Sequence, residues 1–375
     1  MTRVRSIAKL YADARQWLAE DWRHVEESLG GQIEALRGKR ALVVGAAGFL
    51  GFNLLHFFSY INENRSEDPP MKIVAVDNYL RGHPRWIVEL ARSDSNIELR
   101  RFDITQPWNE GDCAFDFIIY GASVASPTFY RRYPLETIDA NVSGLRRMLE
   151  LARWTRCESV LYFSSSEIYG DPPPNEIPTK EGYRGNVACI GPRACYDESK
   201  RLGETLCYLY ARQYEVPVKI VRPFNNYGPG LRLTDGRVIP DFIRSILADR
   251  DIMLHSDGSP MRTFCYSSDA LTGYLLALLS PYNGEPFNIG SDTPEISMRD
   301  LAHVLLRIAG SKRRVTQVPS QESDYLTDNP ARRCPDISKA RAMLGFSPRI
   351  GLEAGLTRML EWHRQFAPLD ELMDT

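Results

Sequence analysis

The chain has 375 residues, enough for two to three domains at roughly 100–200 residues each. Hydrophobic residues make up 43% and charged residues 25%, a globular composition that excludes disordered, collagen-like and coiled-coil chains. Lys and Arg number 46 against 48 Asp and Glu, so the formal net charge of −2 offers no overall attraction to nucleic acid or to an anionic membrane.

The N-terminal residues 1–39 predict a polar helical leader. Apolar Leu10, Tyr11 and Leu18 alternate with charges of both signs, and no apolar stretch typical of a secretory signal is present. This pattern indicates a helix packed on the surface of a domain, with a partner-binding helix as the alternative.

Residues 41–62 carry no charged side chain and are long enough to span a bilayer. The segment also holds Gly45, Gly48 and Gly51, together with Asn53 and His56. These residues fit a buried strand, a glycine turn and a buried helix better than a membrane helix. We therefore expect no membrane span.

Short apolar strands alternate with helical stretches from residue 40 onward. The predicted strands are 41–44, 72–76, 115–120, 160–163 and 218–221. A helix between them carries Ile138, Val142, Leu145 and Leu149 at one-face spacing. This alternation predicts an α/β fold with a doubly wound, Rossmann-type parallel sheet.

The regular alternation of strands and helices ends near Gly228, where Pro, Gly and Asp cluster. We expect a cofactor-binding domain over 40–229 and a smaller, mixed α/β substrate lobe over 230–375, some segments of which return to the first domain. The lobe contains Asp269, which we expect to cap a helix over 270–279 rather than to act as a catalytic acid.

The dispersed cysteines and histidines form no C-x-x-C pair and no histidine pair at helical spacing. Neither a disulfide framework nor a metal site is predicted, so a cytoplasmic, reducing compartment is expected. Cys113 and Cys195 belong to this scattered set. Although Cys195 adjoins a candidate catalytic residue, no base stands at a recognisable spacing, and we assign it no role.

The turn Gly45-Ala-Ala-Gly48-Phe-Leu-Gly51 follows the first strand and opens a helix. Glycines at this spacing allow a tight turn, close approach to a pyrophosphate and packing of the helix on the strand. Asp77 ends the second strand, where its carboxylate would bind ribose hydroxyls and repel a 2′-phosphate. NAD is therefore favoured over NADP, although Arg81 nearby leaves NADP open.

Tyr196 and Lys200 lie four residues apart, on one helical face. A lysine beside a tyrosine favours the phenolate, a base that can take up a hydroxyl proton. The segment Ser164–Gly170 precedes them at the end of a predicted strand, where a doubly wound fold places its active site.

Together, these motifs resemble the extended short-chain dehydrogenase/reductase family that modifies nucleotide sugars. The segment Ile190-Gly-Pro-Arg-Ala-Cys-Tyr-Asp-Glu-Ser-Lys-Arg201 is similar to that of its UDP-glucuronate decarboxylases (UDP-xylose synthases). The resemblance runs from about residue 40 to about residue 365. It implies an NAD-dependent carboxy-lyase that converts UDP-glucuronate through a 4-keto intermediate to UDP-xylose or to the 4-ketopentose.

The resemblance also implies residue roles. Tyr196 would be the base, Lys200 its partner and Ser165 the ligand of the oxidised hydroxyl, while Ser166, Glu167 and Arg333 would face carbon 5 and the carboxylate. Further expected cofactor contacts are Gly45, Gly48, Phe49, Leu50, Gly51, Asp77, Asn78, Asp103 and Ala122. Further expected substrate contacts are Pro127, Arg193, Asn225, Arg237 and Arg262.

Other functions stay open at this level. A 4-epimerase needs the Tyr/Lys pair without the Glu, and a 4,6-dehydratase commonly needs an Asp where Ser166 stands. Val124 and Cys334 depart from the family's usual Pro and Lys. A catalytically silent NAD-binding regulator is the alternative of a different class. The family further implies a homodimer formed through helices near 136–152 and 199–214.

Overall fold

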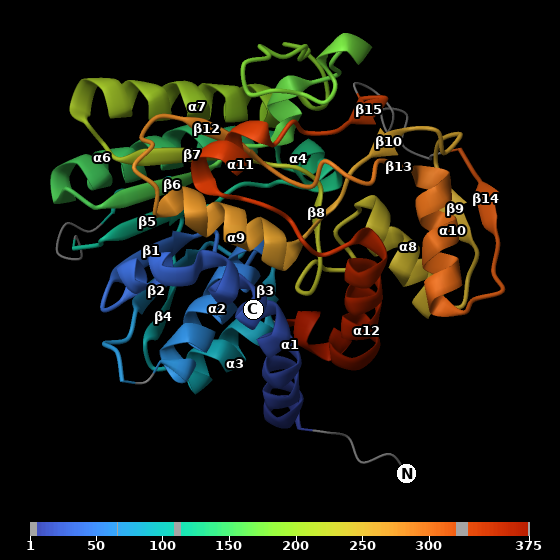
Figure 1. Cartoon of the computed structure of the whole chain (residues 1–375), viewed down its shortest axis with the longest axis horizontal. Helices are drawn as coiled ribbons and strands as arrows, with labels where there is room; N and C mark the ends of the chain where they lie inside the picture. The colour runs from blue at the N-terminus through green and yellow to red at the C-terminus, as the bar shows by residue number, and fades with distance from the viewer. Residues whose placement is uncertain (1–5, 66, 109–113, 320–328, 374–375) are drawn as a thin grey trace.

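A computed structural model describes residues 6–65, 67–108, 114–319 and 329–373. Within these ranges, a seven-stranded parallel sheet forms the centre of the molecule (Figure 1). In spatial order its strands are β12 (Pro286–Ile289), β7 (Val218–Pro223), β6 (Ser159–Phe163), β5 (Phe117–Tyr120), β1 (Arg40–Val44), β2 (Lys72–Asp77) and β4 (Ile97–Arg101). The predicted doubly wound fold is confirmed. Cys113 and residues 1–5 lie outside the described residues.

The sheet is buried on both faces because its strands are apolar at successive positions. In β1, Ala41 and Val43 join one hydrophobic cluster, whereas Leu42 and Val44 join the cluster on the opposite face. The first face is covered by α1 (Ile7–Leu29), α2 (Phe49–Asn64), α3 (Arg85–Ser93), α9 (Ser267–Leu278) and α11 (Ser338–Leu344). The second is covered by α6 (Leu145–Thr155) and α7 (Ala194–Tyr214).

The strand order reverses between β1 and β5. The chain passes outward from β1 to β2 and β4, and then returns to pair β5 with the other edge of β1. In open parallel sheets, the crevice at such a switch point lies beyond the carboxyl ends of the strands and is where ligands bind. This topology positions the site.

Two strands of the sheet, β4 and β12, are missing from the sequence prediction. Strand β4 contains Glu98, Arg100 and Arg101 and lies at a sheet edge, where polar side chains reach solvent. Strand β12 begins with Pro286 at the opposite edge and comes from the C-terminal part of the chain. Its pairing with β7 brings a segment from the C-terminal part of the chain into the central sheet.

The predicted helix around 138–149 consists of three consecutive pieces: α5 (Pro134–Asp139), a π-helical turn over Ala140–Gly144 and α6. The predicted buried face is wrong at Ile138, which is 38% exposed. The wider π turn shifts the helical phase, so that Thr137 and Asn141 are buried instead.

The leader is helical but more deeply packed than a surface helix. In α1 the side chains of Ala14, Leu18 and Val25 are almost fully buried, and the helix packs against α9 and against α12 (Leu352–Asp370). A 3-10 turn over Gly30–Leu36 then leads into β1. Residues 6–36 therefore belong to the same hydrophobic core as the first face of the sheet.

The remaining elements surround the carboxyl ends of the strands, and many build the lobe at the right of Figure 1. Its core joins α8 (Val238–Leu247), α10 (Met298–Ala309) and the first half of α12. Its short strands are β8 (Asn226–Tyr227), β9 (Ile252–Leu254), β10 (Met261–Arg262), β11 (Cys265–Tyr266), β13 (Ile296–Ser297), β14 (Val315–Gln317) and β15 (Arg332–Arg333). Outside the lobe, further short elements are β3 (His83–Pro84), β16 (Leu372–Met373), α4 (Pro127–Arg132) and the 3-10 turns Ser166–Tyr169 and Pro174–Glu176.

Asp269 does not cap α9, contrary to the sequence prediction. One carboxylate oxygen lies 2.8 Å from Nε2 of His24 on α1, and the other accepts the backbone N–H groups of Arg349 and Ile350. The side chain therefore ties three distant segments together. Among the described residues, no helix combines the length and apolarity needed to cross a membrane.

Candidate active site

A cavity of about 630 Å³ opens at the switch point, between the sheet and the lobe. Its walls come from the segments that follow β1, β2, β5, β6 and β7, and from α7, α8 and β15. Every residue that the sequence nominates for catalysis, cofactor or substrate lines this cavity, except Gly51. The structure thus brings together residues from Gly45 to Arg333.

The glycine turn shows why small residues are needed. A Cβ on Gly45, where φ is +83°, would lie 2.7 Å from the backbone of Gly121 and Ala122 at the end of β5. A Cβ on Gly51 would lie 2.1 Å from the carbonyl oxygen of Ala46, so Gly51 allows α2 to pack on the turn. Gly48 precedes the first residue of α2 without any side-chain cap, which leaves the helix N-terminus available to a phosphate.

The expected ribose ligand Asp77 lines the cavity at the end of β2. Its carboxylate accepts the backbone N–H of Ala47 at 3.0 Å and that of Tyr79 at 2.7 Å, which fixes its orientation. Burial raises the pKa of Asp77, and these two hydrogen bonds oppose the rise. Asn78 and Asp103 lie beside it in the cavity wall. The glycine turn, the helix N-terminus and this carboxylate fit an adenine dinucleotide.

Tyr196 and Lys200 on α7 face the cavity floor. The Tyr196 hydroxyl is hydrogen-bonded to Ser165 at the end of β6, and its ring stacks on that of Tyr130 with centroids 5.1 Å apart. Lys200 donates from Nζ to the carbonyl of Phe163 at 2.7 Å, and this atom lies 5.8 Å from the centroid of the Tyr196 ring.

The expected lowering of the tyrosine pKa by lysine is not found. Burial raises the pKa of Tyr196 to about 12, and the hydrogen bond from Ser165 only partly offsets it. Burial also lowers the pKa of Lys200 to about 7, since its ammonium has lost solvent and gained only a carbonyl partner. Both side chains are therefore driven towards their neutral forms.

A carboxylate surrounded by arginines occupies the other side of Ser165. Glu167 forms ion pairs with Arg193, which directly precedes α7, and, at 2.5 Å, with Arg333 on β15. Arg333 also donates to Ser166 Oγ and to the carbonyl of Gly170, both at 3.1 Å. Although burial would raise the pKa of Glu167, the neighbouring arginines hold it below its ordinary range.

A third arginine joins this group through strand pairing. Arg262 on β10 stands opposite Arg333 in the parallel β10–β15 register. Its guanidinium donates to the carbonyls of Met261, Ala331 and Pro330 and to the Asn329 side chain, none of which carries charge. Burial and the positive neighbour Arg333 lower its pKa to about 10. The group therefore favours an anionic ligand.

The remaining predicted substrate contacts lie on the lobe side of the cavity. Asn225 has a left-handed backbone with φ of 43° and donates to the carbonyl of Thr263 at 3.0 Å. Arg237 precedes α8, is partly exposed and lies 2.9 Å from Asp235. Pro127 begins α4 and also lines the cavity.

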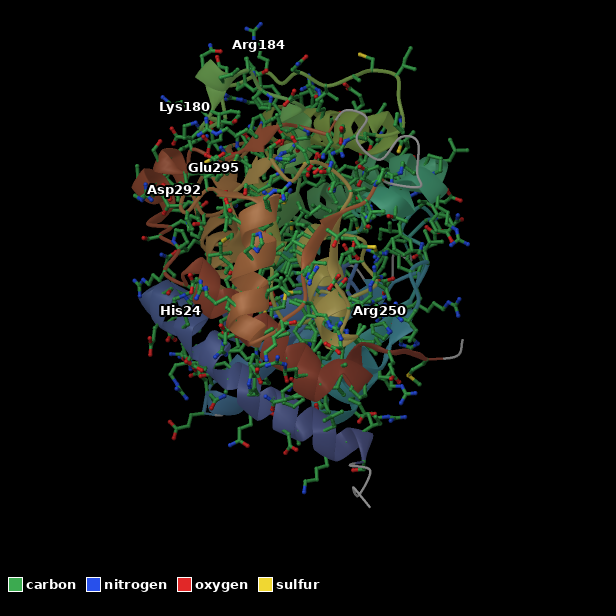
Figure 2. The ribbon with its side chains drawn as sticks, turned by 90° about the vertical axis from the view of Figure 1, so that its right-hand side faces the viewer. His24, Lys180, Arg184, Arg250, Asp292 and Glu295 are labelled. Carbon is green, nitrogen blue, oxygen red and sulfur yellow. The ribbon has the colours of Figure 1, made fainter. Side chains whose placement is uncertain are left out.

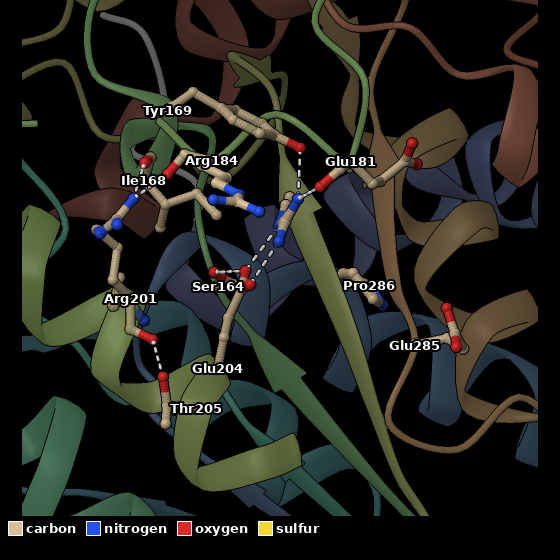
Figure 3. Close-up of polar contacts among 12 residues, drawn as sticks. Ser164, Ile168, Tyr169, Glu181, Arg184, Arg201, Glu204, Thr205, Glu285 and Pro286 are labelled. Atoms are coloured by element: carbon tan, nitrogen blue, oxygen red, sulfur yellow. Dashed lines mark hydrogen bonds and ion pairs between the residues drawn. The ribbon is translucent and has the colours of Figure 1, made fainter. Parts of the chain in front are cut away.

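A buried polar network joins α7 to the ends of β6 and β7 (Figure 3). Glu204, one turn beyond Lys200 on α7, accepts hydrogen bonds from Ser164 at 2.5 Å and from Arg222 Nε at 2.8 Å. Arg222 on β7 also donates to the Tyr169 hydroxyl at 2.7 Å. The network fixes α7 relative to the ends of β6 and β7, and hence Tyr196 relative to Ser165.

Sequence reasoning assigned no role to three charged residues in or beside the cavity: Arg232 and Asp235, which line it, and Asp197. Asp197 is buried beside Arg193, at 3.6 Å, and burial raises its pKa to about 7. Asp235 and Arg232 connect the two sides of the cavity. Asp197 follows Tyr196 and Asp235 lies two residues before Arg237, so proximity to a motif residue was the available signal.

Taken together, the switch-point cavity, the glycine turn and the Tyr/Lys helix define a dinucleotide-dependent enzyme fold that acts on an anionic substrate. The profile of the NAD dependent epimerase/dehydratase family matches residues 41–290, and the chain belongs to that family. This membership confirms the family resemblance and NAD as the cofactor.

Relatives of known activity match most of the chain. It is 36% identical over 326 residues to UDP-glucuronic acid decarboxylase 3 of Arabidopsis thaliana, covering 86% of this chain and 88% of the relative. It is also 36% identical over 331 residues to UDP-glucuronic acid decarboxylase 1 of Xenopus tropicalis, covering 87% of this chain and 72% of the relative.

Solved structures share the fold. UDP-glucose 4-epimerase from Thermotoga maritima superimposes with a TM-score of 0.74 at 23% identity, covering 88% of this chain and 99% of that structure. UDP-glucuronic acid 4-epimerase from Bacillus cereus gives a TM-score of 0.70 at 24% identity, covering 87% and 99%.

Proposed function

We propose that the protein catalyses the NAD-dependent decarboxylation of UDP-glucuronate through a 4-keto intermediate, giving UDP-xylose or the 4-ketopentose. The observation that carries this proposal is the arginine group around Glu167, next to the hydrogen-bonded Tyr196–Ser165 pair. It offers a carboxylate-binding position beside a proton acceptor. The 36% identical decarboxylases support the choice of substrate.

The charges at this position favour a substrate carboxylate. Arg193, Arg262 and Arg333 carry three positive charges, which are opposed by Glu167 and by Asp197, whose pKa of about 7 leaves it only partly ionised at neutral pH. Because guanidinium binds carboxylate through two parallel hydrogen bonds, Arg333 is suited to hold the sugar acid.

The proposed mechanism assigns each step to a side chain. Bound NAD would supply the electron acceptor for oxidation of the sugar alcohol. Ser165 holds the hydroxyl at carbon 4, and Tyr196 takes up its proton as the phenolate, which the positive charge of bound NAD would favour over the neutral phenol. Arg333 and Ser166 hold the carboxylate of the resulting β-keto acid until the bond between carbons 5 and 6 breaks, releasing CO₂ and leaving an enolate. Glu167 faces carbon 5, where that enolate takes up a proton from solvent water, because Glu167 is itself held ionised by its arginine neighbours.

Product analysis tests this function. UDP-glucuronate labelled with ¹³C in the carboxyl group is incubated with the purified chain and NAD, and the products are identified by mass spectrometry. We expect labelled CO₂ and a UDP-pentose, with Tyr196→Phe losing at least about 100-fold in rate because it cannot accept the proton. The surface variant Glu285→Gln serves as the control, with an unchanged rate.

The outcome also separates the alternatives. A product that keeps the labelled carbon and has inverted carbon 4 would establish a 4-epimerase and overturn decarboxylation. NAD binding without turnover of UDP-glucuronate would point to a regulatory protein. Release of the ketopentose instead of UDP-xylose would show that the final reduction does not occur in place.

We further propose that the active protein is a homodimer. Exposed apolar side chains gather on α5, α6 and α7, where Leu135 is 71% exposed, Trp154 76% and Tyr208 50%. Large apolar surface of this kind indicates a protein interface, and helices from a second copy would bury it.

We propose a cytoplasmic location. The six cysteines in the described ranges are free thiols, and four of them are buried in the folded chain. Thiols persist in reducing compartments, whereas disulfides are typical of oxidising ones. Fractionation of the native source with compartment markers would test this location.

We also keep the division into a leader (1–39), a cofactor domain (40–229) and a lobe (230–375) as a proposal. The separate core formed by α8, α10 and α12 supports the lobe. The return of α9 and β12 to the sheet explains why the lobe includes segments that pack on the first domain.

A further inference from the structure

Asp235 lies between the cofactor side and the substrate side of the cavity. Its side chain is only 5% exposed and stands 2.9 Å from Arg81 Nη2 and 2.9 Å from Arg237 Nε. Although burial would raise the pKa of Asp235, Arg237 and Arg81 hold it below its ordinary range, so the carboxylate is ionised at neutral pH. One buried charge is thus shared by two arginines.

These two arginines belong to opposite sides of the site. Arg81 comes four residues after Asp77, in the loop that follows β2, and its guanidinium also covers the ring of Phe129 at 4.2 Å. Arg237 directly precedes α8 in the lobe. Both line the cavity, and Arg237 is one of the expected substrate contacts.

A second contact from the same turn reaches the glycine loop. Arg232 donates to the carbonyl of Arg81 at 2.7 Å and to the carbonyl of Ala47 at 3.2 Å. The N–H of Ala47 in turn donates to Asp77. Residues 231–237, named here the coupling segment, therefore contact both loops that would hold the dinucleotide.

The coupling segment is also fixed from a third direction. Ser126, which precedes α4, donates from its hydroxyl to the backbone carbonyl of Asp235. A Cβ on Gly236, where φ is +80°, would lie 2.9 Å from Oγ1 of Thr128. Such close contacts allow the segment little freedom to move independently of the cofactor side.

We infer that Asp235 is a positioning residue that couples the binding of the dinucleotide to the binding of the nucleotide-sugar diphosphate. This inference rests on the proposed function, a UDP-sugar substrate, and takes the expected substrate contact at Arg237 to be with its diphosphate. A dinucleotide that orders the loop around Arg81 fixes Asp235, and Asp235 then holds Arg237 in place before the substrate arrives. Less ordering is left to the second ligand, which therefore binds more tightly.

Calorimetric titration of UDP into the full chain, with and without saturating NAD, tests the coupling. We expect NAD to tighten UDP binding by about 10-fold in the wild type, within the usual range of coupling between sites, and by less than about twofold in Asp235→Asn. The control is Asp292→Asn, which removes an exposed ion pair with Arg341 outside the cavity and keeps the wild-type ratio.

A second variant covers failure of Asp235→Asn to fold. Arg81→Gln leaves Asp235 and Arg237 paired but cuts the link to the cofactor side, so it also loses the tightening by NAD. The double variant then shows no further loss, because both changes break the same link.

The results separate the inference from the proposed function. If UDP binds the wild type with the same affinity in the presence and absence of NAD, the coupling is overturned. The coupling is also overturned if NAD tightens UDP binding in both Asp235→Asn and Arg81→Gln as much as in the wild type. Absence of UDP binding to the wild type in either state overturns the proposed function, and the coupling with it.

Discussion

At the scale of single residues, burial rather than pairing sets the charge of the two side chains on α7. Tyr196 and Lys200 are both withdrawn from water, and their pKa values move apart, to about 12 for Tyr196 and about 7 for Lys200. A neutral amine beside a neutral phenol costs less than two buried charges without close contact. The protein therefore carries a stability penalty at this position, which depends on pH.

Replacing Lys200 with Met should reveal that penalty. The folded-state pKa of about 7 lies below the unfolded value of about 10.4, so between these pH values the unfolded chain binds a proton that the folded chain does not. The free energy of unfolding of the wild type should rise relative to Lys200→Met by up to about 1.4 kcal/mol per pH unit in this window. Urea unfolding at pH 6, 8 and 10 measures it.

The free energy of unfolding is compared between the wild type and Lys200→Met at each pH. This comparison controls for lost packing, because a packing change lowers the free energy of unfolding of the variant equally at every pH. Parallel curves would show that Lys200 titrates near its ordinary pKa in the folded protein. Activity should vanish in the variant, and the stability of the variant relative to the wild type should be greater at pH 6 than at pH 10.

The sequence predicted cavity residues well where they follow strand ends or belong to a motif, as for Gly45, Asp77 and Tyr196. It could not show that Arg262 and Arg333 are adjacent, because that follows from pairing between two short strands far apart in the chain. Nor could it show that Lys200 would bind the Phe163 carbonyl. Such contacts depend on tertiary packing, which local patterns do not encode.

At the scale of elements, apolar runs identified the interior strands, and the same criterion failed at the sheet edges. Strand β4 is charged because one side of an edge strand faces solvent. The amphipathic pattern of α1 predicted its helix but not its burial depth, since α9 and α12, which cover it, come from the end of the chain. Spatial neighbours of this kind are invisible in a local pattern.

The position of α1 predicts that it unfolds with the rest of the protein. Leu18→Ala should lower the free energy of unfolding by about 2–5 kcal/mol, because Leu18 is 1% exposed and its removal leaves a cavity. Leu247→Ala makes the same chemical change at the end of α8, where Leu247 is 38% exposed. It should lower the free energy of unfolding by less than about 1 kcal/mol. Denaturant unfolding followed by circular dichroism compares them. Equal, small effects would show that α1 contributes little to the core.

At the scale of the whole molecule, the net charge of −2 conceals a positive cavity within a mixed surface. Charged side chains of both signs occupy the outer face in Figure 2, where Lys180 and Glu295 are found towards the same edge. Three arginines face the interior around Glu167. A near-neutral exterior with a cationic cavity admits a small anion without attracting nucleic acid, because the attraction acts only at short range.

The exposed apolar surface of α5, α6 and α7 leads to the last prediction. Trp154→Glu places a charge where the proposed dimer interface would exclude water, and should convert a species of twice the chain mass into one of single chain mass. Met253→Glu, at a 52% exposed position in the lobe, is the matched control and should leave the mass unchanged. Light scattering after size-exclusion chromatography measures both. A wild-type chain that already runs at single mass would refute the dimer, as would a Trp154→Glu protein that keeps twice the chain mass.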